Sequence, residues 1–178
     1  MTRKEEFEQA KKDLEQNFDS GWNTILSLAN ADYEEAMEFV ALAYYRGDGI
    51  EMDEPLAYQW FHRIVKVYPT NGFIWNKIAD CHFYGYGIPK NQEESIKYYQ
   101  KAWDNGVADA GSDIGWIYSF GDIANHNDMT AAKWFQRAAD KGSSQGMYFM
   151  GYFYSEGYGG LPVSEKMAAK YLRQAAAK

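Results

Sequence analysis

Few residues of this sequence carry side chains that could do covalent or metal chemistry. The chain has three histidines and one cysteine, and Cys81 stands directly beside His82. Adjacent positions suit a metal chelate or a nucleophile–base pair poorly, and a small buried thiol is the commoner state of a lone cysteine. His62 follows an aromatic pair, and His126 lies in a polar stretch. We expect no metal site, no catalytic group and no cofactor.

Three glycine-rich segments could instead hold phosphate: GDG at 47–49, GYG at 85–87 and GYGG at 157–160. A phosphate loop needs a strand before it and a Lys-Ser or Lys-Thr pair within it, and none of the three has either. Glycine also accepts the left-handed backbone that ends many helices. We therefore expect these segments to close helices rather than to bind nucleotides.

The same segments belong to a repeat of about 36 residues. Stretches 40–50, 78–88, 114–124 and 150–160 align without gaps, and their first residues are 38, 36 and 36 positions apart. A second landmark, an aromatic residue followed by another bulky one, recurs at spacings of 38, 36 and 37. Two landmarks that keep one period over four copies establish the repeat. The second landmark is Trp60-Phe61, Tyr98-Tyr99, Trp134-Phe135 and Tyr171-Leu172.

Each copy is predicted to form a helix, a glycine loop and a second helix. The first helix should end at a left-handed glycine, and a residue with a capping oxygen should begin the second helix about six residues later. Gly106 and Gly142 then close the second helix of copies two and three. Between the helices, we expect Trp60, Tyr98 and Trp134 to occupy the core. The loop glycines are Gly47, Gly85, Gly121 and Gly157, and the capping residues are Asp53, Asn91, Asn127 and Ser164.

The first thirty residues diverge from this pattern. A helical stripe begins at Phe7, and Thr2 with Glu5 fits a capping box ahead of it. A repeat array needs an atypical end unit to cover its first exposed face. We predict an N-terminal helical cap at residues 1–30 and four helix-pair repeats. The repeats are expected at about 31–70, 71–106, 107–142 and 143–178.

Copy three shows a recognisable signature. It reads Ala110…Ile114-Gly115…Tyr118…Gly121, then Ala131…Trp134-Phe135…Arg137-Ala138-Ala139…Gly142. This pattern resembles the Sel-one-like repeat (SLR) family, a relative of the tetratricopeptide repeat, over residues 31–178. The resemblance implies an all-α, right-handed solenoid of stacked antiparallel helix pairs that acts as a binding scaffold. His82 departs from the family tyrosine, Ile123 replaces the second loop glycine, and copy four has one extra loop residue.

The first helix of each copy has two faces. At 100° per residue, the signature positions cluster on one side, which should pack into the solenoid. By analogy with tetratricopeptide repeats, the other side lines a concave groove. Eight of its 20 residues are aromatic, five are acidic and one is basic. Neighbouring helices could bury some of these rings, but aromatics with a polar rim are typical of interaction hot spots.

From this second face we predict a partner-binding groove that mixes aromatic rings with carboxylates. The predicted groove residues are Glu35, Glu38, Tyr45, Phe73, Asp80, Phe83, Tyr84, Asp109, Trp116, Phe120, Tyr148, Tyr152 and Glu156.

Composition narrows the class of partner. The 178 residues carry a net charge of −7, which argues against nucleic acid and against an anionic membrane, because both need a basic surface. The longest uncharged run, Gly142–Ser155, has 14 residues, whereas a membrane span needs roughly 20 apolar residues. No secretory signal is visible in residues 1–13, and a single cysteine forms no internal disulfide. We expect a cytoplasmic protein whose partner has a basic surface.

Two functions compete at this point. The first is a non-enzymatic protein-interaction scaffold, acting as an adaptor or as a stoichiometric inhibitor; an immunity-type protein that neutralises a toxin is one such case. The alternative is a hydrolase related to the penicillin-binding, cysteine-rich members of the repeat family. Those relatives have a disulfide in each repeat, whereas this chain has one cysteine in total. The sequence therefore favours the scaffold.

Overall fold

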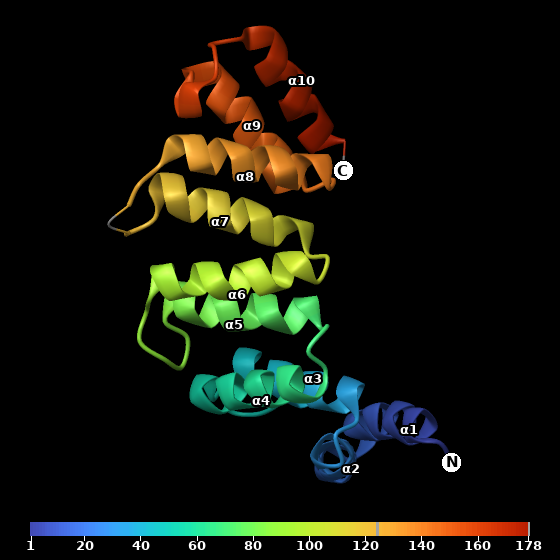
Figure 1. Ribbon diagram of the computed structural model, residues 1–178. Helices are drawn as coiled ribbons and strands as arrows, with labels where there is room; N and C mark the ends of the chain where they lie inside the picture. Colours follow the sequence, from blue (N-terminus) through green and yellow to red (C-terminus); the bar gives the residue numbers. More distant parts are fainter. Residues whose placement is uncertain (124, 178) are drawn as a thin grey trace.

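The computed structural model describes residues 1–123 and 125–177, and over these residues its regular structure is entirely helical. Helix hairpins are stacked from the blue N-terminal end to the red C-terminal end (Figure 1). The predicted all-α solenoid is confirmed. None of the helices in this described part combines the length and the apolarity that crossing a membrane requires. The α-helices are α1 (Arg3–Gln16), α2 (Phe18–Asn30), α3 (Glu34–Arg46), α4 (Glu54–Val67), α5 (Gly72–Tyr84), α6 (Gln92–Asp104), α7 (Ala108–Phe120), α8 (Asp128–Asp140), α9 (Ser144–Glu156) and α10 (Glu165–Ala176), and a 3-10 turn, η1, spans Tyr158–Gly160.

Each repeat copy forms one hairpin, and neighbouring hairpins pack through the second helix of one copy and the first helix of the next. The hairpins are α3–α4, α5–α6, α7–α8 and α9–α10, and α4 packs on α5, α6 on α7 and α8 on α9 (Figure 1). Helix α7 also contacts α9 directly. The first helices of copies three and four therefore bring their side chains onto a shared surface.

Side-chain caps begin the second helices at the predicted residues. Asp53 Oδ1 accepts a hydrogen bond from the Leu56 N–H at 2.9 Å, and Asn91, Asn127 and Ser164 make the equivalent bond in the other copies. Each cap satisfies a backbone donor that the helix itself leaves without a partner. These bonds fix where each second helix starts and so keep the hairpins in register.

The helix-closing glycines follow the prediction in three copies and depart from it in the third. Gly47, Gly85 and Gly157 are left-handed, with φ of 74°, 89° and 74°. Gly121 has φ −71° and ψ 165°, so the prediction of a left-handed residue there is wrong. In the other copies a second glycine two residues later is also left-handed, whereas copy three has Ile123 at that place. A β-branched side chain disfavours positive φ, so this loop leaves its helix by an extended route.

In the first three copies, the core between the helices uses the second residue of the aromatic pair more than the first. Phe61, Tyr99 and Phe135 are 0–2% exposed. Of the predicted core residues, Trp60 is buried, but Tyr98 and Trp134 are only half-buried, so the prediction is wrong for these two. A step of one residue turns the side chain by 100° around the helix, which is enough to move it from the core to the edge of the hairpin.

Gly115 on α7 lies directly against Phe135 on α8. A Cβ atom at Gly115 would stand 2.7 Å from Cε1 of the Phe135 ring, closer than packed carbon atoms approach. Gly115→Ala should therefore lower the free energy of unfolding by about 1–2 kcal/mol, although alanine is the better helix former. Urea denaturation measures the effect, with Gln174→Ala at an exposed position of α10 as control. A Gly115→Ala protein as stable as the wild type would contradict this packing.

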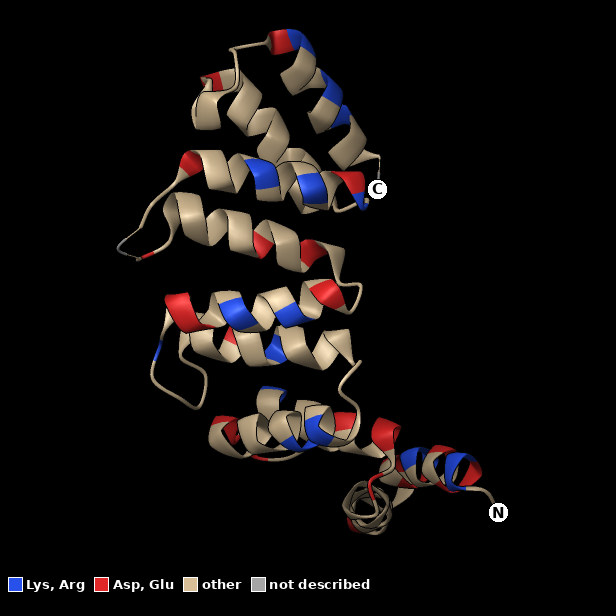
Figure 2. Cartoon of the chain, in the orientation of Figure 1, with Lys and Arg blue, Asp and Glu red and all other residues tan. Residues whose placement is uncertain are grey.

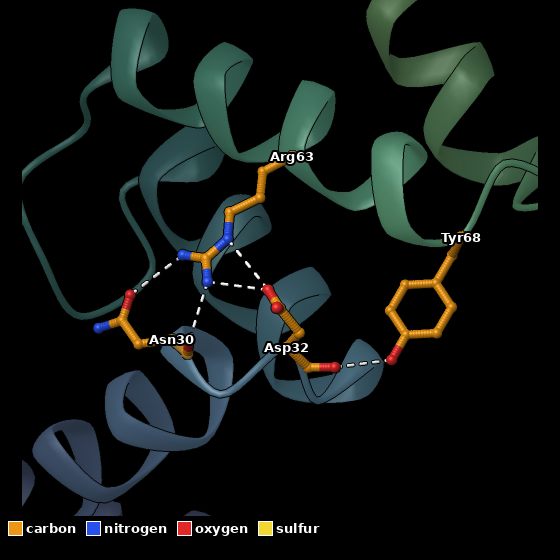
Figure 3. A network of polar contacts seen from close by, with 4 residues as sticks. All are labelled: Asn30, Asp32, Arg63 and Tyr68. Atoms are coloured by element: carbon orange, nitrogen blue, oxygen red, sulfur yellow. Dashed lines mark hydrogen bonds and ion pairs between the residues drawn. The ribbon is translucent and has the colours of Figure 1, made fainter.

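A polar network joins the N-terminal helices to the first repeat (Figure 3). The Arg63 guanidinium, on α4, donates through Nη2 to the Asn30 carbonyl oxygen at 2.8 Å and to Asp32 Oδ1 at 2.8 Å. Its Nη1 donates to Asn30 Oδ1, and the Tyr68 hydroxyl donates to the Asp32 carbonyl oxygen at 2.6 Å. Asp32 has φ 56°, rare for a residue other than glycine. The network therefore holds the turn between α2 and α3 in an otherwise disfavoured conformation.

Arg63→Lys should weaken this joint, because a single ammonium group does not reproduce the planar fork of the guanidinium. We expect the free energy of unfolding to fall by only about 1 kcal/mol, since Arg63 and Asp32 are both partly exposed. Hydrogen exchange should show the loss of protection first in α1 and α2. Lys66→Arg, at an exposed position of the same helix, is the control and should change neither measurement.

Candidate partner-binding groove

Aromatic rings from the four first helices, together with Tyr86 in the loop after α5, form a continuous row, which we call the aromatic ladder. Its successive ring centroids are 4.6 to 6.3 Å apart, the range in which aromatic side chains pack against one another. The ladder crosses three repeat-to-repeat boundaries, so partner contacts on it would depend on the stacking of the repeats. Its members are Tyr45, Tyr86, Tyr84, Phe83, Trp116, Phe120, Phe149, Tyr148 and Tyr152.

Helical spacing puts these rings on one side. Trp116 and Phe120 are four residues apart on α7, and Tyr148 and Tyr152 are four apart on α9, so each pair shares a helix face. Phe83, at the end of α5, meets Trp116 edge-to-face at 5.4 Å. The contact joins copy two to copy three.

Two adjoining pockets open along the ladder, with Trp116 as their common wall. The first, of about 320 Å³, is here called the acidic pocket; the second, of about 310 Å³, is the tyrosine pocket. Tyr84 and Tyr148 are more than half exposed, and adjacent exposed aromatic side chains are typical of interaction sites. The acidic pocket is lined by Phe83, Tyr84, Tyr99, Asp113, Trp116 and Gln145, and the tyrosine pocket by Trp116, Phe120, Tyr148, Phe149 and Tyr152.

One carboxylate, that of Asp113, lines the acidic pocket, and those of Asp80 and Asp109 are close enough for their charges to act on it. Asp80 is paired with Lys77, whose Nζ is 2.7 Å from Asp80 Oδ2, and it accepts the Tyr99 hydroxyl at 2.8 Å. Asp109 accepts a hydrogen bond from the Ser143 hydroxyl. Asp113 has a single long contact among the described residues, 3.5 Å from Gln145 Nε2 to its Oδ1. The carboxylate that lines the pocket is thus the least well compensated of the three.

This arrangement perturbs the acidities of the groups around the pocket. Burial, followed by the charges of Asp80 and Asp109, raises the pKa of Asp113 to about 7. Burial and the charge of Asp80 raise the pKa of the Tyr99 and Tyr84 hydroxyls above the ordinary tyrosine value. At neutral pH the two hydroxyls stay protonated, whereas Asp113 is poised between its neutral and charged forms.

The first helices and the second helices also differ in charge. The four first helices, α3, α5, α7 and α9, carry seven acidic and two basic residues, a net charge of −5. The four second helices, α4, α6, α8 and α10, carry nine basic and seven acidic residues, a net charge of +2. Figure 2 shows the difference in the middle of the stack, where α7 has only red bands and α8 has blue bands along its centre. The helices that form the ladder are therefore the negative ones.

The sequence matches the Sel1 repeat at residues 34–65, 76–107, 109–143 and 144–178, three quarters of the chain. The chain belongs to the Sel1 repeat family. No curated protein matches its sequence. The boundaries of the matched repeats fall close to those of the four helix hairpins.

Solved structures share this Sel1 repeat fold. A protective antigen present in uropathogenic Escherichia coli strains, which displays an SLR fold, is 24% identical with a TM-score of 0.78, covering 88% of this chain and 33% of its own. A Sel1 repeat protein from Oxalobacter formigenes is 22% identical with a TM-score of 0.80, covering 88% and 61%. Cysteine-rich protein B of Helicobacter pylori is 20% identical with a TM-score of 0.51, covering 65% and 86%. This chain thus spans a third and about three fifths of the length of the first two relatives, and the likeness is one of fold.

Within the Sel1 repeats, the structure brings six predicted groove residues into the walls of the two pockets. These are Phe83, Tyr84, Trp116, Phe120, Tyr148 and Tyr152. Asp80 and Asp109 lie beside the acidic pocket, where their charges act on Asp113. Tyr45 extends the ladder through Tyr86, at 5.6 Å between ring centroids.

The other predicted groove residues line neither pocket. Glu35 and Glu156 are exposed near the ends of α3 and α9. Glu38 is half-buried and accepts a hydrogen bond from Asn71, and burial raises the pKa of its carboxyl. Phe73 is 43% exposed, with the Lys77 ammonium 5.6 Å from its ring centroid. The pockets therefore occupy the second to fourth Sel1 repeats, and Tyr45 is the residue through which the first repeat joins the ladder.

Three pocket residues lay outside the predicted face. Asp113 and Phe149 come one position before Ile114 and Met150, the first residues of the aligned stretches of the third and fourth copies. That position is only about 20° around the helix from the last one counted as groove, so a wider helical face would have included it. Tyr99 comes from the second helix α6, and a count restricted to first helices does not reach it.

Cys81 and His82 of the second repeat, whose side chains could act as a nucleophile or a base, are packed against other side chains. Cys81 is fully buried, and burial raises the pKa of its thiol to about 12, so little reactive thiolate exists at neutral pH. His82 stacks on Tyr98 at 4.8 Å, and burial lowers the pKa of its imidazole. In residues 1–123 and 125–177, no three His, Cys, Asp or Glu side chains converge to hold a metal ion.

Proposed function

We propose that this Sel1 repeat protein is a non-enzymatic interaction module that binds a protein partner with a basic surface along the aromatic ladder. The observation that carries the proposal is the pair of adjoining pockets, which are walled by aromatic rings, three of them exposed, and the first of which is lined by the Asp113 carboxylate. Rings supply large contact area at a small cost in side-chain entropy, and interaction hot spots are enriched in tryptophan and tyrosine.

Charge supports a basic partner. The ladder helices carry a net charge of −5 and the whole chain −7, so a basic surface is attracted to this face and an acidic one is repelled. Such fields act mainly on the rate of association and on partner choice. Association should therefore slow as ionic strength rises.

A stoichiometric inhibitor in the cytoplasm, such as an immunity-type protein that neutralises a basic toxin, is the specific role that size and charge favour within this proposal. The hydrolase alternative requires an activated nucleophile. Cys81, the candidate nucleophile of the second repeat, is buried, and the pKa of its thiol is raised. A hydrolase panel run on the purified protein separates the two: turnover that survives purification and disappears with a groove substitution would overturn the scaffold proposal.

Trp116→Ala tests the groove, because Trp116 is the wall that both pockets share. The purified protein and this variant are used to capture partners from native lysate, and captured proteins are titrated against both. We expect affinity to fall at least about tenfold, as for a hot-spot residue. Gln174→Ala, at an exposed position of α10, is the control and should bind as the wild type. Equal binding by Trp116→Ala and the wild type would place the interface elsewhere.

A further inference from the structure

We propose that the acidic pocket is an arginine-binding site, which accepts a single arginine side chain of the partner. The inference rests on the proposed function and deepens it, because it names the side chain that anchors the partner. Rings form the walls of the pocket, and one carboxylate and one amide, those of Asp113 and Gln145, supply its polar lining. That combination matches the guanidinium group, which is flat, cationic and rich in hydrogen-bond donors.

The charge balance around the pocket favours an added cation. Asp80, Asp109 and Asp113 supply three carboxylates, and Lys77 is the cation paired with one of them. With Asp113 ionised, the local charge is −2. Asp80 has its ammonium and hydroxyl partners, and Asp109 has a hydroxyl partner, whereas Asp113 has only the long contact with Gln145. A guanidinium in the pocket would give Asp113 the partner that the free protein lacks.

The walls favour a planar cation over a compact or neutral group. Trp116 and Phe83 meet at 71°, and Phe83 and Tyr84 at 79°, so the ring faces and edges enclose the space from several directions. Guanidinium groups stack on aromatic faces, and tryptophan attracts cations most strongly among the aromatic side chains. A neutral apolar side chain would bury the Asp113 carboxyl without compensation, which costs free energy. An acidic side chain would add repulsion.

The protonation of Asp113 should be linked to occupancy. The titratable and polar groups that face it are Asp80, Lys77 and Tyr84 on α5, Tyr99 on α6, Asp109 on its own helix and Gln145 on α9. Burial and the two carboxylates favour its neutral form in the free protein. A guanidinium favours the ionised form, so arginine binding should strengthen as pH rises from 6 to 8, with uptake of the ligand coupled to release of a proton.

A pair of short peptides tests the site directly. The probe is N-acetyl-Ala-Arg-Ala-amide, and its control is the same peptide with citrulline, which has the same shape but no charge. Binding is followed by the Trp116 indole N–H resonance in NMR titrations at constant ionic strength. We expect the citrulline peptide to bind at least about tenfold more weakly, and Asp113→Asn to weaken the arginine peptide to a similar extent. Asp140→Asn, at an exposed position of α8, should bind as the wild type.

Equal affinity for the two peptides, or an Asp113→Asn protein that binds the arginine peptide as the wild type does, would overturn the arginine site. Capture of the natural partner separates this failure from failure of the proposed function. If Trp116→Ala loses the partner while Asp113→Asn keeps it at full affinity, the groove stands and the arginine anchor is wrong. If both variants keep the partner at full affinity, the groove itself is wrong.

Discussion

Phe135→Ala should lower the free energy of unfolding by about 3–5 kcal/mol, the cost of removing a large ring from a packed core. The Phe135 ring is 0% exposed. It stacks on Phe149 at 4.6 Å and meets Phe153 edge-to-face at 5.1 Å, so it joins the third repeat to the fourth. The backbone of Gly115 on α7 packs directly against this ring, and glycine has no side chain that could move into the space left by the ring. The cavity should therefore stay largely open.

Trp134→Ala is the matched control, because it removes a larger ring one residue earlier on the same helix. Trp134 is half-buried at the edge of the hairpin, where it meets Trp103 at 5.5 Å and the Arg137 guanidinium at 4.1 Å. We expect it to cost about 1–2 kcal/mol, since solvent can fill the space that the ring leaves. Urea denaturation of both variants measures the two losses in the free energy of unfolding. A larger loss for Trp134→Ala than for Phe135→Ala would show that the core lies on the other side of α8.

The loss of stability in Phe135→Ala should also be largest in the repeats next to the substitution. Stability in a repeat array is close to a sum over repeats and nearest-neighbour interfaces. Loss of the Phe135 ring should therefore raise hydrogen exchange in α7, α8 and α9 before it does so in α1 and α2. Uniform loss of protection throughout the chain would instead mean that the repeats unfold as one unit.

The sequence predicts this fold well because its signals are local. A capping oxygen and a glycine act within one turn of helix, so Asp53 and Gly47 mark the ends of the first repeat's helices without reference to any other repeat. Gly121 fails for an equally local reason, since its partner glycine is replaced by Ile123. The choice between Trp134 and Phe135 as core residue is different. One residue is 100° of rotation, and only the position of the neighbouring helix decides which ring it covers.

The candidate groove is less predictable because it is built across repeats. Rings four residues apart, as at Trp116 and Phe120, share a face in any helix, and the sequence identifies them. Whether Phe83 contacts Trp116 depends on how two repeats stack. Tyr99 lines the acidic pocket because the second helix α6 packs against the first helices that form the rest of the pocket. Asp113 is missed because the helical face was counted too narrowly, by one position. Its raised pKa comes from burial and from the charges of Asp80, on another helix, and of Asp109, and the residue type at position 113 indicates neither cause.

Asp113→Asn should raise the free energy of unfolding by about 2 kcal/mol at pH 8 and leave it nearly unchanged at pH 4. The pKa of Asp113 is raised to about 7 in the folded protein, above the ordinary aspartate value of the unfolded chain. Between these two values the folded state holds a proton that the unfolded state has released, so rising pH destabilises the folded state. Above pH 7 the full cost is present. Carrying this charge in the folded protein costs about 2 kcal/mol, less than full burial would cost, because the side chain is partly exposed to solvent.

Asp80→Asn supplies the contrast, since Asp80 already has its partners. Removing its charge breaks the ion pair with Lys77 and weakens the hydrogen bond from Tyr99, so stability at pH 8 should fall rather than rise. Unfolding of both variants is measured by urea denaturation between pH 4 and pH 8. Neutralising a carboxylate that stabilises the fold lowers the free energy of unfolding, whereas neutralising one that serves to bind a ligand raises it. If Asp113→Asn is less stable than the wild type at pH 8, Asp113 has a structural role in the fold, and its charge is already compensated in the free protein.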